Sequence, residues 1–251
     1  MTPAGSLPRT RHSSSSDESP AARPEAVELH VVDRGETLQF VPRRVVIAGY
    51  TGRDRGAAEL HIEELAAIGV PRPEQVPDVN VFGPELFCTA PLLETTAVHT
   101  SGEAEPVIVF SGGEWFLGVG SDHTDRDLER VDMRASKGAC VKPMSREVWS
   151  HETAGPRWER LVLRSFVNRG TSEPYQDGSL SYFMDRSSLV ELLEARLGDD
   201  LDGHVIFCGT LPLTTGSFVY SNHYRVQLLD PVTGDSLEHQ YGVELVGPTA
   251  G

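Results

Sequence analysis

The 251-residue sequence contains few cysteines, and their arrangement excludes two classes of protein. Cys88, Cys140 and Cys208 are odd in number and lack C-x-x-C spacing, which argues against a disulfide framework and against a zinc site. The chain also lacks a run of about eighteen apolar residues, and its first residues lack the apolar core of a signal peptide. We therefore expect a protein of the reducing cytoplasm without a membrane span.

Basic residues are also scarce, and this limits the possible partners. There are 22 Lys and Arg against 37 Asp and Glu, a net charge of −15. Such a charge repels phosphate backbones and anionic membrane surfaces, so we expect neither nucleic acid nor membrane as a partner. Residues 1–24 are rich in Ser and Pro and poor in large apolar side chains, which predicts a disordered tail. Residues 25–251 are long enough for a single domain with one core.

The remaining chain has the patterns of many short strands and few helices. Two helices are expected, Arg55–Ile68 and Ser187–Leu197, the second with Ser187 or Ser188 as N-cap and Gly198 at its end. These patterns predict a β-rich α+β protein. The expected strands are Val27–Val32 and Leu38–Val41, which form a hairpin, then Arg44–Ala48, Trp158–Val167, Leu180–Met184, His204–Cys208, Ser217–Leu229 and His239–Val246.

Three carboxylates are placed where one divalent cation could bind them. Residues Pro106–Val119 read as a hairpin around a Ser-Gly-Gly-Glu turn. Glu103 and Glu105 precede it and point to one face of an extended strand, and the returning strand brings Asp122 close to both. Oxygen ligands of this kind suit Mg²⁺, Mn²⁺ or Ca²⁺. The alternative is a solvated strand edge with ordinary surface acids.

Five segments, in order, resemble motifs of the fumarylacetoacetate hydrolase family and together span roughly residues 44 to 215. The E-x-E strand precedes a segment similar to the family's G-x-x-x-x-N-D-x-[ST]-x-R-D. The later segments are similar to its G-K-S-F-D-x-F-x-P, N-G-x-x-x-Q-D-G and L-x-P-G-D-V-I-x-T-G-T-P. The matching stretches here are Glu103–Glu105, Gly118–Asp127, Ser136–Pro143, Val167–Gly178 and Asp200–Pro212.

The resemblance implies a fold, an assembly and roles for individual residues. It implies a mixed β-sandwich roll of the C-terminal domain type of that family, with few helices, a metal site at one mouth, and a homodimer. Lys137 matches the family's active-site lysine, and Arg126 matches a position that contacts substrate or supports the site. Gly209 and Thr210 match the family's substrate-facing turn, and Tyr50 lies in its substrate-loop region. Each of these residues has a structural alternative, such as packing, a surface position or an ion pair of Arg126 with Asp125 or Asp127.

The chain departs from the family pattern at the water-activating pair. Arg55 stands where the family's His is expected, and a guanidinium stays protonated. Six residues further on, His61 and Glu64 restore the H-x-x-E spacing, and residues three apart are neighbours on a helix. We therefore expect His61, oriented by Glu64, to act as the base, with residues 49–55 as a lid. The alternative is an exposed helical histidine beside solvated glutamates.

The function that follows is metal-dependent chemistry on a small 2-oxo acid or 1,3-dicarbonyl substrate. Our first hypothesis is hydrolysis of a C–C bond in an acylpyruvate-like compound, because a metal can stabilise the enolate that forms. The alternative reactions are decarboxylation and keto–enol tautomerisation, which need no activated water. A second alternative is a non-catalytic small-molecule binding protein on the same fold, suggested by Ser121 in place of the family's Asn and by a shortened C-terminus.

Overall fold

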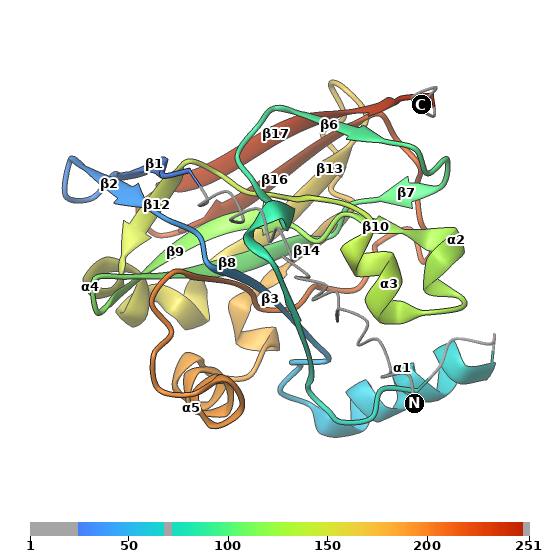
Figure 1. The fold of residues 1–251 in the computed structure, drawn as a ribbon, viewed down its shortest axis with the longest axis horizontal. Helices are drawn as coiled ribbons and strands as arrows, with labels where there is room; N and C mark the ends of the chain where they lie inside the picture. The colour runs from blue at the N-terminus through green and yellow to red at the C-terminus, as the bar shows by residue number, and fades with distance from the viewer. Residues whose placement is uncertain (1–24, 68–71, 248–251) are drawn as a thin grey trace, which may run out of the picture.

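The computed structural model describes residues 25–67 and 72–247, and most of its strands belong to two sheets (Figure 1). The larger sheet has eight strands in the order β2-β1-β12-β9-β8-β15-β3-β4, and the smaller has five in the order β14-β13-β16-β17-β6. The larger comprises β2 (Glu36–Phe40), β1 (Val27–Val31), β12 (Glu147–Ser150), β9 (Glu114–Ser121), β8 (Ala104–Ser111), β15 (His204–Phe207), β3 (Arg44–Gly49) and β4 (Asp78–Phe82). The smaller comprises β14 (Gln176–Ser179), β13 (Val162–Val167), β16 (His223–Leu229), β17 (Ser236–Leu245) and β6 (Leu92–Thr95).

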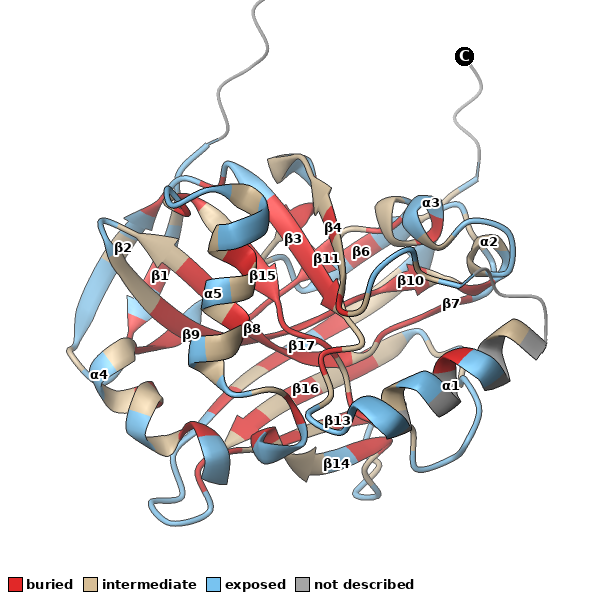
Figure 2. Cartoon of the chain, turned by 90° about the horizontal axis from the view of Figure 1, so that it is seen from below, coloured by how far each residue is buried: buried red, intermediate tan, exposed pale blue. Residues whose placement is uncertain are grey.

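The eight-stranded sheet buries both of its faces, because its central strands are almost continuously apolar. On one face, Ile108 of β8 packs in a core that includes Val226 of β16 in the other sheet. On the opposite face, Val107 and Val109 belong to a second core with Phe207 of β15. Figure 2 shows the buried residues concentrated in these strands, with mostly exposed and half-buried helices around them. The sheets thus form a rolled sandwich.

Two long helices and several short ones lie outside the sheets. Helix α5 (Arg186–Leu197) covers the first core, whereas α1 (Arg55–Ala67) follows β3. Two strand pairs, β7 (Thr100–Ser101) with β10 (Thr124–Asp125) and β5 (Phe87–Cys88) with β11 (Lys142–Pro143), accompany the helices α2 (Arg126–Glu129) and α3 (Met133–Gly138). Helix α4 (His151–Ala154) and the 3-10 turns η1 (Pro84–Leu86), η2 (Gly155–Arg160) and η3 (Leu180–Tyr182) complete the described elements. None of the described helices has the length and apolar character required to cross a membrane.

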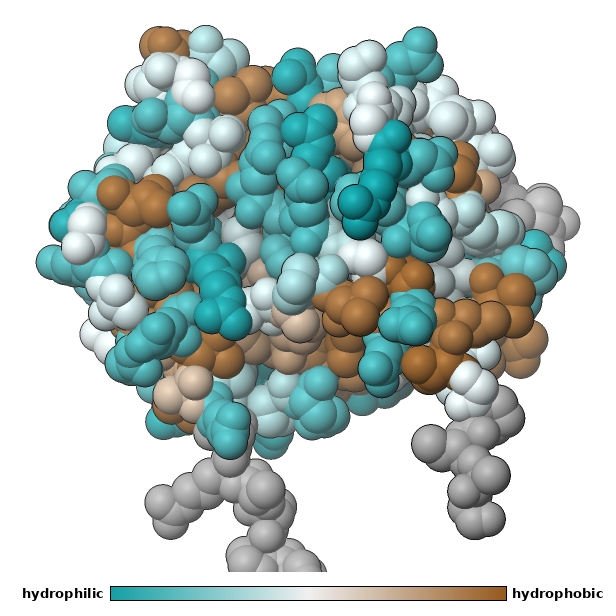
Figure 3. Space-filling model, turned by 90° about the horizontal axis from the view of Figure 1, so that it is seen from above, coloured by the Kyte–Doolittle hydropathy of each residue, from teal (hydrophilic) through white to brown (hydrophobic). Residues whose placement is uncertain are grey.

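The outward face of the five-stranded sheet is mainly polar at its centre (Figure 3). Arg225 of β16 and Glu238 of β17 contribute to it and form a salt bridge of 3.5 Å. Hydrophobic side chains gather in separate patches around this polar region. Burial alternates along β16, so one side of the strand is buried and the other is partly exposed. This pattern is typical of an antiparallel sheet with one solvent-exposed face.

The structure confirms the β-rich α+β class and most of the predicted strands, and it corrects several boundaries. The hairpin over 106–119 is β8 and β9, paired from Ala104↔Ser121 to Ser111↔Glu114. The expected strand Leu180–Met184 is wrong, because its first residues form the 3-10 turn η3, and Ser217–Leu229 is strand only from His223. The predicted tail, residues 1–24, and the predicted end of the first helix at Ile68 lie outside the described residues.

Candidate functional site

The β8–β9 hairpin brings the three predicted carboxylates to its open end. Ala104 pairs with Ser121 across the hairpin, and the Asp122 N–H donates to the carbonyl of Glu103 at 3.0 Å. Glu105 and Asp122 are buried, and the side chain of Glu103 is 15% exposed. The predicted hairpin is therefore present, and the use of these three acids as a metal site stays a prediction.

Two lysines hold the carboxylate of Asp122. Lys137 of α3 donates to Oδ2, and Lys142 of β11 lies 3.0 Å from Oδ1, which Thr124 also approaches at 3.2 Å. Burial alone would raise the pKa of Asp122, but the charges and hydrogen bonds of the two lysines outweigh it and hold that pKa well below its ordinary value. Conversely, although burial lowers the pKa of Lys137, the charges of Asp122 and Glu105 raise it overall. Asp122 and Lys137 therefore form a stable ion pair.

Glu105 is in the opposite situation, because it is buried and the nearby Lys137 pairs with Asp122 rather than with it. Its Oε2 accepts a hydrogen bond from the Gly209 N–H at 2.9 Å. In the described part of the chain, no Lys, Arg or His nitrogen forms a salt bridge with it. Burial, and then the charge of Asp122, raise the pKa of Glu105 well above its ordinary value. The protonated form of this carboxyl group is thus favoured in the described structure.

Gly209 can make this contact because its backbone adopts a conformation that favours glycine. Its φ is +102°, and a Cβ there would lie 2.2 Å from Oγ1 of Thr51. The neighbouring Thr210 hydroxyl donates to the Ala104 carbonyl at 2.9 Å and accepts from Nε2 of Gln176 at 2.7 Å. Both predicted substrate residues therefore lie at the cluster, and both have a structural function in forming it.

Arg126 anchors the outer side of the cluster. Its guanidinium is 2% exposed and pairs with Glu103 and Glu129, each at 2.9 Å, while the ring of Phe218 lies 3.9 Å from it. The alternative pairing with Asp125 or Asp127 is wrong, because Asp125 instead caps α2. The charges of Glu103 and Glu129 raise the pKa of Arg126 above its ordinary value despite burial, so this side chain stays positive.

His123 points away from the acids into an aromatic environment, as the alternation along a strand predicts. Its Nδ1 lies 3.2 Å from the hydroxyl of Tyr241, which donates to Oγ of Ser121 at 2.8 Å. The rings of Tyr224 and Tyr241 both contact His123 edge to face. Burial, with the charge of Lys142, lowers the pKa of His123 to about 3, so the imidazole is neutral. It packs behind the site.

Tyr50 lines a cavity of about 480 Å³. Its φ of +55° is in the left-handed region, and burial raises its pKa, with the charges of Lys137 and Glu129 acting in opposite directions. The cavity is also lined by the first turn of α3, the helix that carries Lys137. Its lining residues are Tyr50, Arg72, Pro73, Glu74, Asp78, Val79, Asn80, Val131, Asp132, Met133 and Arg134.

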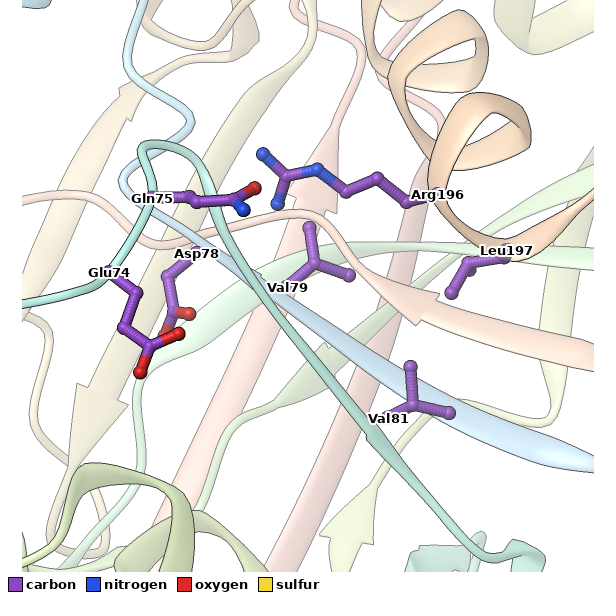
Figure 4. A pocket seen from close by; sticks show the side chains of 7 residues that line it. All are labelled: Glu74, Gln75, Asp78, Val79, Val81, Arg196 and Leu197. Atoms are coloured by element: carbon purple, nitrogen blue, oxygen red, sulfur yellow. The ribbon is translucent and has the colours of Figure 1, made fainter.

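A second cavity, of about 390 Å³, lies between the edge strand β4 and the end of α5 (Figure 4). The carboxylates of Glu74 and Asp78 lie together at the left of the view, the guanidinium of Arg196 lies near the side chain of Gln75, and Val79 lies below that guanidinium. Arg196 is held there by a hydrogen bond of 2.7 Å to the Pro77 carbonyl. None of the three clustered carboxylates lines this cavity, which is also true of the cavity beside Tyr50.

The predicted base cannot be placed from the described residues. Helix α1 carries His61 and Glu64, but the side chains of both lie outside what the structure describes. Backbone hydrogen bonds join the preceding loop to residues 182–184. The Arg53 N–H donates to the Tyr182 carbonyl at 2.9 Å, and the Met184 N–H donates to the Thr51 carbonyl at 2.8 Å. A lid formed by residues 49–55 would therefore have to break these backbone hydrogen bonds.

The donor chemistry of the cluster fits a hard divalent cation, but its present geometry is not that of a closed metal site. Ligands around one Mg²⁺ at about 2.1 Å lie within about 4.2 Å of one another. Among the described residues, only Glu114, His151 and Glu152 have three ligand atoms that all lie within 4.8 Å of one another. One oxygen each from Glu103, Glu105 and Asp122 does not meet this criterion. At that other group, however, Arg34 already pairs with both glutamates, so the charge there is largely satisfied.

Sequence reasoning missed three residues that build the site. Gln176 is fully buried and bridges β8, β13 and the Gly209 turn, with hydrogen bonds to the Ala104 N–H, the Ser165 hydroxyl and the Leu211 carbonyl. Its place in the N-G-x-x-x-Q-D-G match was the available signal. Lys142 falls at a variable position of the Ser136–Pro143 match and Tyr241 lies outside the matched segments, so neither had a signal of its own.

Comparisons with known proteins identify a family and a fold. Residues 48–241 match the model of a family described as "Protein of unknown function (DUF2848)". A search of curated proteins finds no match.

Solved structures share the fold at low sequence identity. Fumarylpyruvate hydrolase from Pseudomonas aeruginosa, solved in complex with Mn²⁺ and pyruvate, is 16% identical with a TM-score of 0.59, covering 91% of this chain and 100% of that one. A fumarylacetoacetate hydrolase family protein from yeast is 14% identical with a TM-score of 0.54, covering 82% and 95%. The predicted fold is thereby confirmed.

Proposed function

The chain belongs to the family of proteins of unknown function DUF2848 and has the fold of the fumarylacetoacetate hydrolases, and from this premise we propose that it is a divalent-metal-dependent hydrolase. The proposed reaction is cleavage of a C–C bond in a 2-oxo acid or 1,3-dicarbonyl compound of the acylpyruvate kind. Mg²⁺ or Mn²⁺ is the proposed cofactor, since all candidate ligands are oxygens.

One observation carries this proposal: Glu105 is a buried carboxylate beside Asp122 with no cation paired to it. Burial and the charge of Asp122 raise the pKa of Glu105, and a positive charge bound beside it would favour its ionised form. A divalent cation there would supply that charge, polarise a substrate carbonyl and stabilise the negative charge that develops when the C–C bond breaks. Glu103 completes the ligand set if its carboxylate turns away from Arg126.

The chain's own residues then divide the remaining tasks. Lys137 keeps Asp122 ionised and is the proposed donor to a substrate oxygen. Arg126 holds Glu103, which would have to turn toward a bound cation, and the charge of Arg126 would favour a substrate carboxylate. Tyr50 provides one wall of the adjoining cavity, in which the substrate's acyl group is proposed to lie.

The alternative reactions are decarboxylation and tautomerisation, which would use the same metal site and need no activated water. Hydrolysis needs a group that takes a proton from water, and His61 is the proposed candidate, oriented by Glu64. If His61 does not reach the site, the same residues would support the reactions that require no activated water.

Metal binding is tested by titrating Mn²⁺ into wild type and Glu105→Gln in a calorimeter. The substitution keeps an acceptor for the Gly209 N–H and removes only the charge, so the fold is expected to persist while Mn²⁺ affinity falls at least about tenfold. Glu94→Gln, at an exposed position of β6, is the matched control and leaves the affinity unchanged. Equal Mn²⁺ affinities for all three proteins would place the cation elsewhere.

The reaction is tested on a panel of acylpyruvates, with separate measurement of carboxylate products, CO₂ and enol content. Hydrolysis predicts Mn²⁺-dependent release of pyruvate, and His61→Ala lowers that rate by about 10²–10⁴-fold. The control His99→Ala replaces an exposed side chain and is expected to leave the rate within about twofold. Release of CO₂ alone would establish the decarboxylase instead.

We also propose a homodimer in the cytoplasm, on the basis of the family resemblance and of the cysteine pattern. A monomeric mass in light scattering at micromolar concentration contradicts the assembly. The absence of a pairing among Cys88, Cys140 and Cys208 in the described structure agrees with reduced thiols.

A further inference from the structure

The edge strand β4 lies beside both of the cavities described above. Among the described strands, β4 ends the eight-stranded sheet and pairs only with β3. The cavities of about 390 and 480 Å³ have Glu74, Asp78 and Val79 in common, so they adjoin along this strand. An edge strand carries backbone N–H and C=O groups that can pair with another chain. The position of β4 between two cavities therefore makes it a candidate interaction surface.

One hydrogen bond shows which backbone groups of β4 face the open edge. Arg134 donates to the carbonyl of Val81 at 2.8 Å, on the side of β4 away from β3. In an antiparallel strand, the N–H and C=O of one residue point to the same side, and this side alternates along the chain. The N–H and C=O of Val79 therefore also face the open edge. No loop or side chain of the described residues bonds to them, so they are available to a partner strand.

Two arginines lie along this edge, on opposite faces of the sheet. Arg196 of α5 donates to the carbonyl of Pro77 at 2.7 Å, on the face where Val79 packs against the first core. The guanidinium of Arg134 lies 4.8 Å from the ring of Phe82, which packs against the second core. Among the described residues, the hydrogen bonds of both arginines go only to these strand carbonyls. Because a guanidinium has several N–H donors, each retains donors for a carboxylate.

The two cavities favour different side chains. In the smaller cavity, the guanidinium of Arg196 and the amide of Gln75 lie close together, and Leu197 adds an apolar wall (Figure 4). A carboxylate on a short apolar stem suits these groups. The larger cavity is lined in part by Tyr50 and by Val131, whose side chain is 74% exposed. An apolar side chain would cover this exposed surface.

We propose that β4 is a docking edge for an extended peptide of another protein, which adds a strand beside Val79. Successive side chains of a strand point to opposite faces. One residue of the peptide thus places a carboxylate against Arg196, and its neighbour places an apolar group in the cavity beside Tyr50. Glu74 and Asp78 lie together, apart from Arg196, and oppose further acidic residues. The partner is therefore an extended segment with one Asp or Glu next to an apolar residue.

Docking at β4 uses none of the three clustered carboxylates, so it is independent of the proposed reaction. The cavity beside Tyr50 is, however, the proposed place of the substrate's acyl group. A bound peptide and a substrate would exclude each other there. Peptide binding is therefore measured without substrate.

The probe is the fluorescein-labelled synthetic peptide Thr-Val-Glu-Leu-Thr-Val, and its binding to the full chain is measured by fluorescence anisotropy. Replacing its Glu by Lys is expected to weaken binding at least about tenfold, because the charge-assisted hydrogen bond to Arg196 is lost. No binding of the Glu peptide up to about 1 mM would overturn the inference. Equal binding of the Glu and Lys peptides would do the same.

Pairing through the backbone is tested with two N-methylated forms of the peptide. One form carries methyl groups on the odd-numbered residues and the other on the even-numbered residues. Only one of these sets faces β4, so one form is expected to bind at least about tenfold more weakly and the other within about twofold of the parent. Equal effects of the two forms contradict strand addition.

Variants of the protein locate the site. Arg196→Met is expected to weaken the Glu peptide at least about tenfold and the Lys peptide by less than about twofold. The matched control is Arg164→Met on β13, which pairs with Asp177 at 3.0 Å and leaves binding unchanged. Equal losses from both substitutions contradict the proposed site. Thermal melts establish that the variants are folded, and should Arg196→Met not fold, the N-methylated pair on wild type decides the question.

A second copy of this chain is the alternative occupant of the edge. Val79→Pro removes an N–H that faces outward, and it does not remove a hydrogen bond to β3. A wild-type dimer that becomes monomeric in Val79→Pro, together with no binding of the peptide, would show that β4 pairs with itself. That result overturns the inference. Weaker peptide binding by a folded Val79→Pro protein supports it.

Discussion

At the scale of single residues, the site depends on a glycine as much as on its charged groups. Gly209 has a φ of +102°, which lets its N–H donate to Glu105. A Cβ at this position would lie 2.2 Å from Oγ1 of Thr51 and 3.3 Å from the carbonyl oxygen of Ala48. Backbone atoms cannot move aside as a flexible side chain can. The hydrogen bond to Glu105 and the close packing therefore both require glycine at this position.

We expect Gly209→Ala to lower the free energy of unfolding by about 2 kcal/mol more than Gly216→Ala, because strain and a steric clash act together. Gly216 is the matched control, since its φ is also positive, at +66°, but nothing lies within 4 Å of its would-be Cβ. Urea denaturation of both variants measures the difference. Equal losses would mean that the turn relaxes freely, and that Glu105 does not depend on its geometry.

At the scale of secondary-structure elements, the N-cap of α5 in the structure differs from the one that the sequence pattern predicted. The pattern favoured Ser187 or Ser188 as N-cap, whereas the structure has Asp185, whose Oδ1 accepts from the Ser188 N–H at 3.0 Å. Gly198 follows the helix as predicted, with φ +95°. The helix is therefore longer at its start than the apolar pattern suggested, and a carboxylate at its N-terminus also suits the helix dipole.

Asp185→Ala is expected to destabilise the protein by about 1 kcal/mol, the usual cost of losing an N-cap. Ser187→Ala, two residues further on and not the cap, is expected to change stability by less than about 0.5 kcal/mol. Thermal or urea unfolding of the two variants compares them directly. A larger loss from Ser187→Ala than from Asp185→Ala would restore the sequence-based assignment.

At the scale of the whole molecule, buried histidines link the stability of the fold to pH. His239 of β17 lies 8% exposed against Tyr241, and burial, with a smaller contribution from the charge of Arg146, lowers its pKa to about 4. The unfolded chain binds this proton near pH 6.5, so unfolding takes up a proton between about pH 6.5 and 4. The contribution of His239 is fully present above that window and is lost as the pH falls through it.

His239→Phe is accordingly expected to weaken the dependence of unfolding free energy on pH between 7 and 4, by up to about 3 kcal/mol over that range. Urea titrations of wild type and variant at several pH values measure the change. Parallel curves for the two proteins would show that His239 is protonated in the fold and would falsify this linkage.

The sequence by itself determined the elements that local patterns specify. Two apolar runs around a Gly-Gly turn predicted the β8–β9 hairpin, whose open end carries Glu103, Glu105 and Asp122, although their carboxylate oxygens do not all lie within 4.8 Å of one another. Ordered motif matches indicated the fold that the solved structures then confirmed. The predicted metal ligands and the His61 and Glu64 base remain predictions that the experiments above decide.

Only the tertiary structure decided how the cluster is charged. Lys142 follows the hairpin in the chain and pairs with Asp122 at 3.0 Å. Tyr241 lies 120 residues from Ser121 and yet donates to its hydroxyl at 2.8 Å. The packing of strands brings both residues to the open end of the hairpin. The tertiary structure also pairs Glu103 with Arg126, and no salt bridge of Glu105 is present among the described residues. Long-range packing sets such pairings, since no local pattern in the chain encodes the distance between side chains on different sheets.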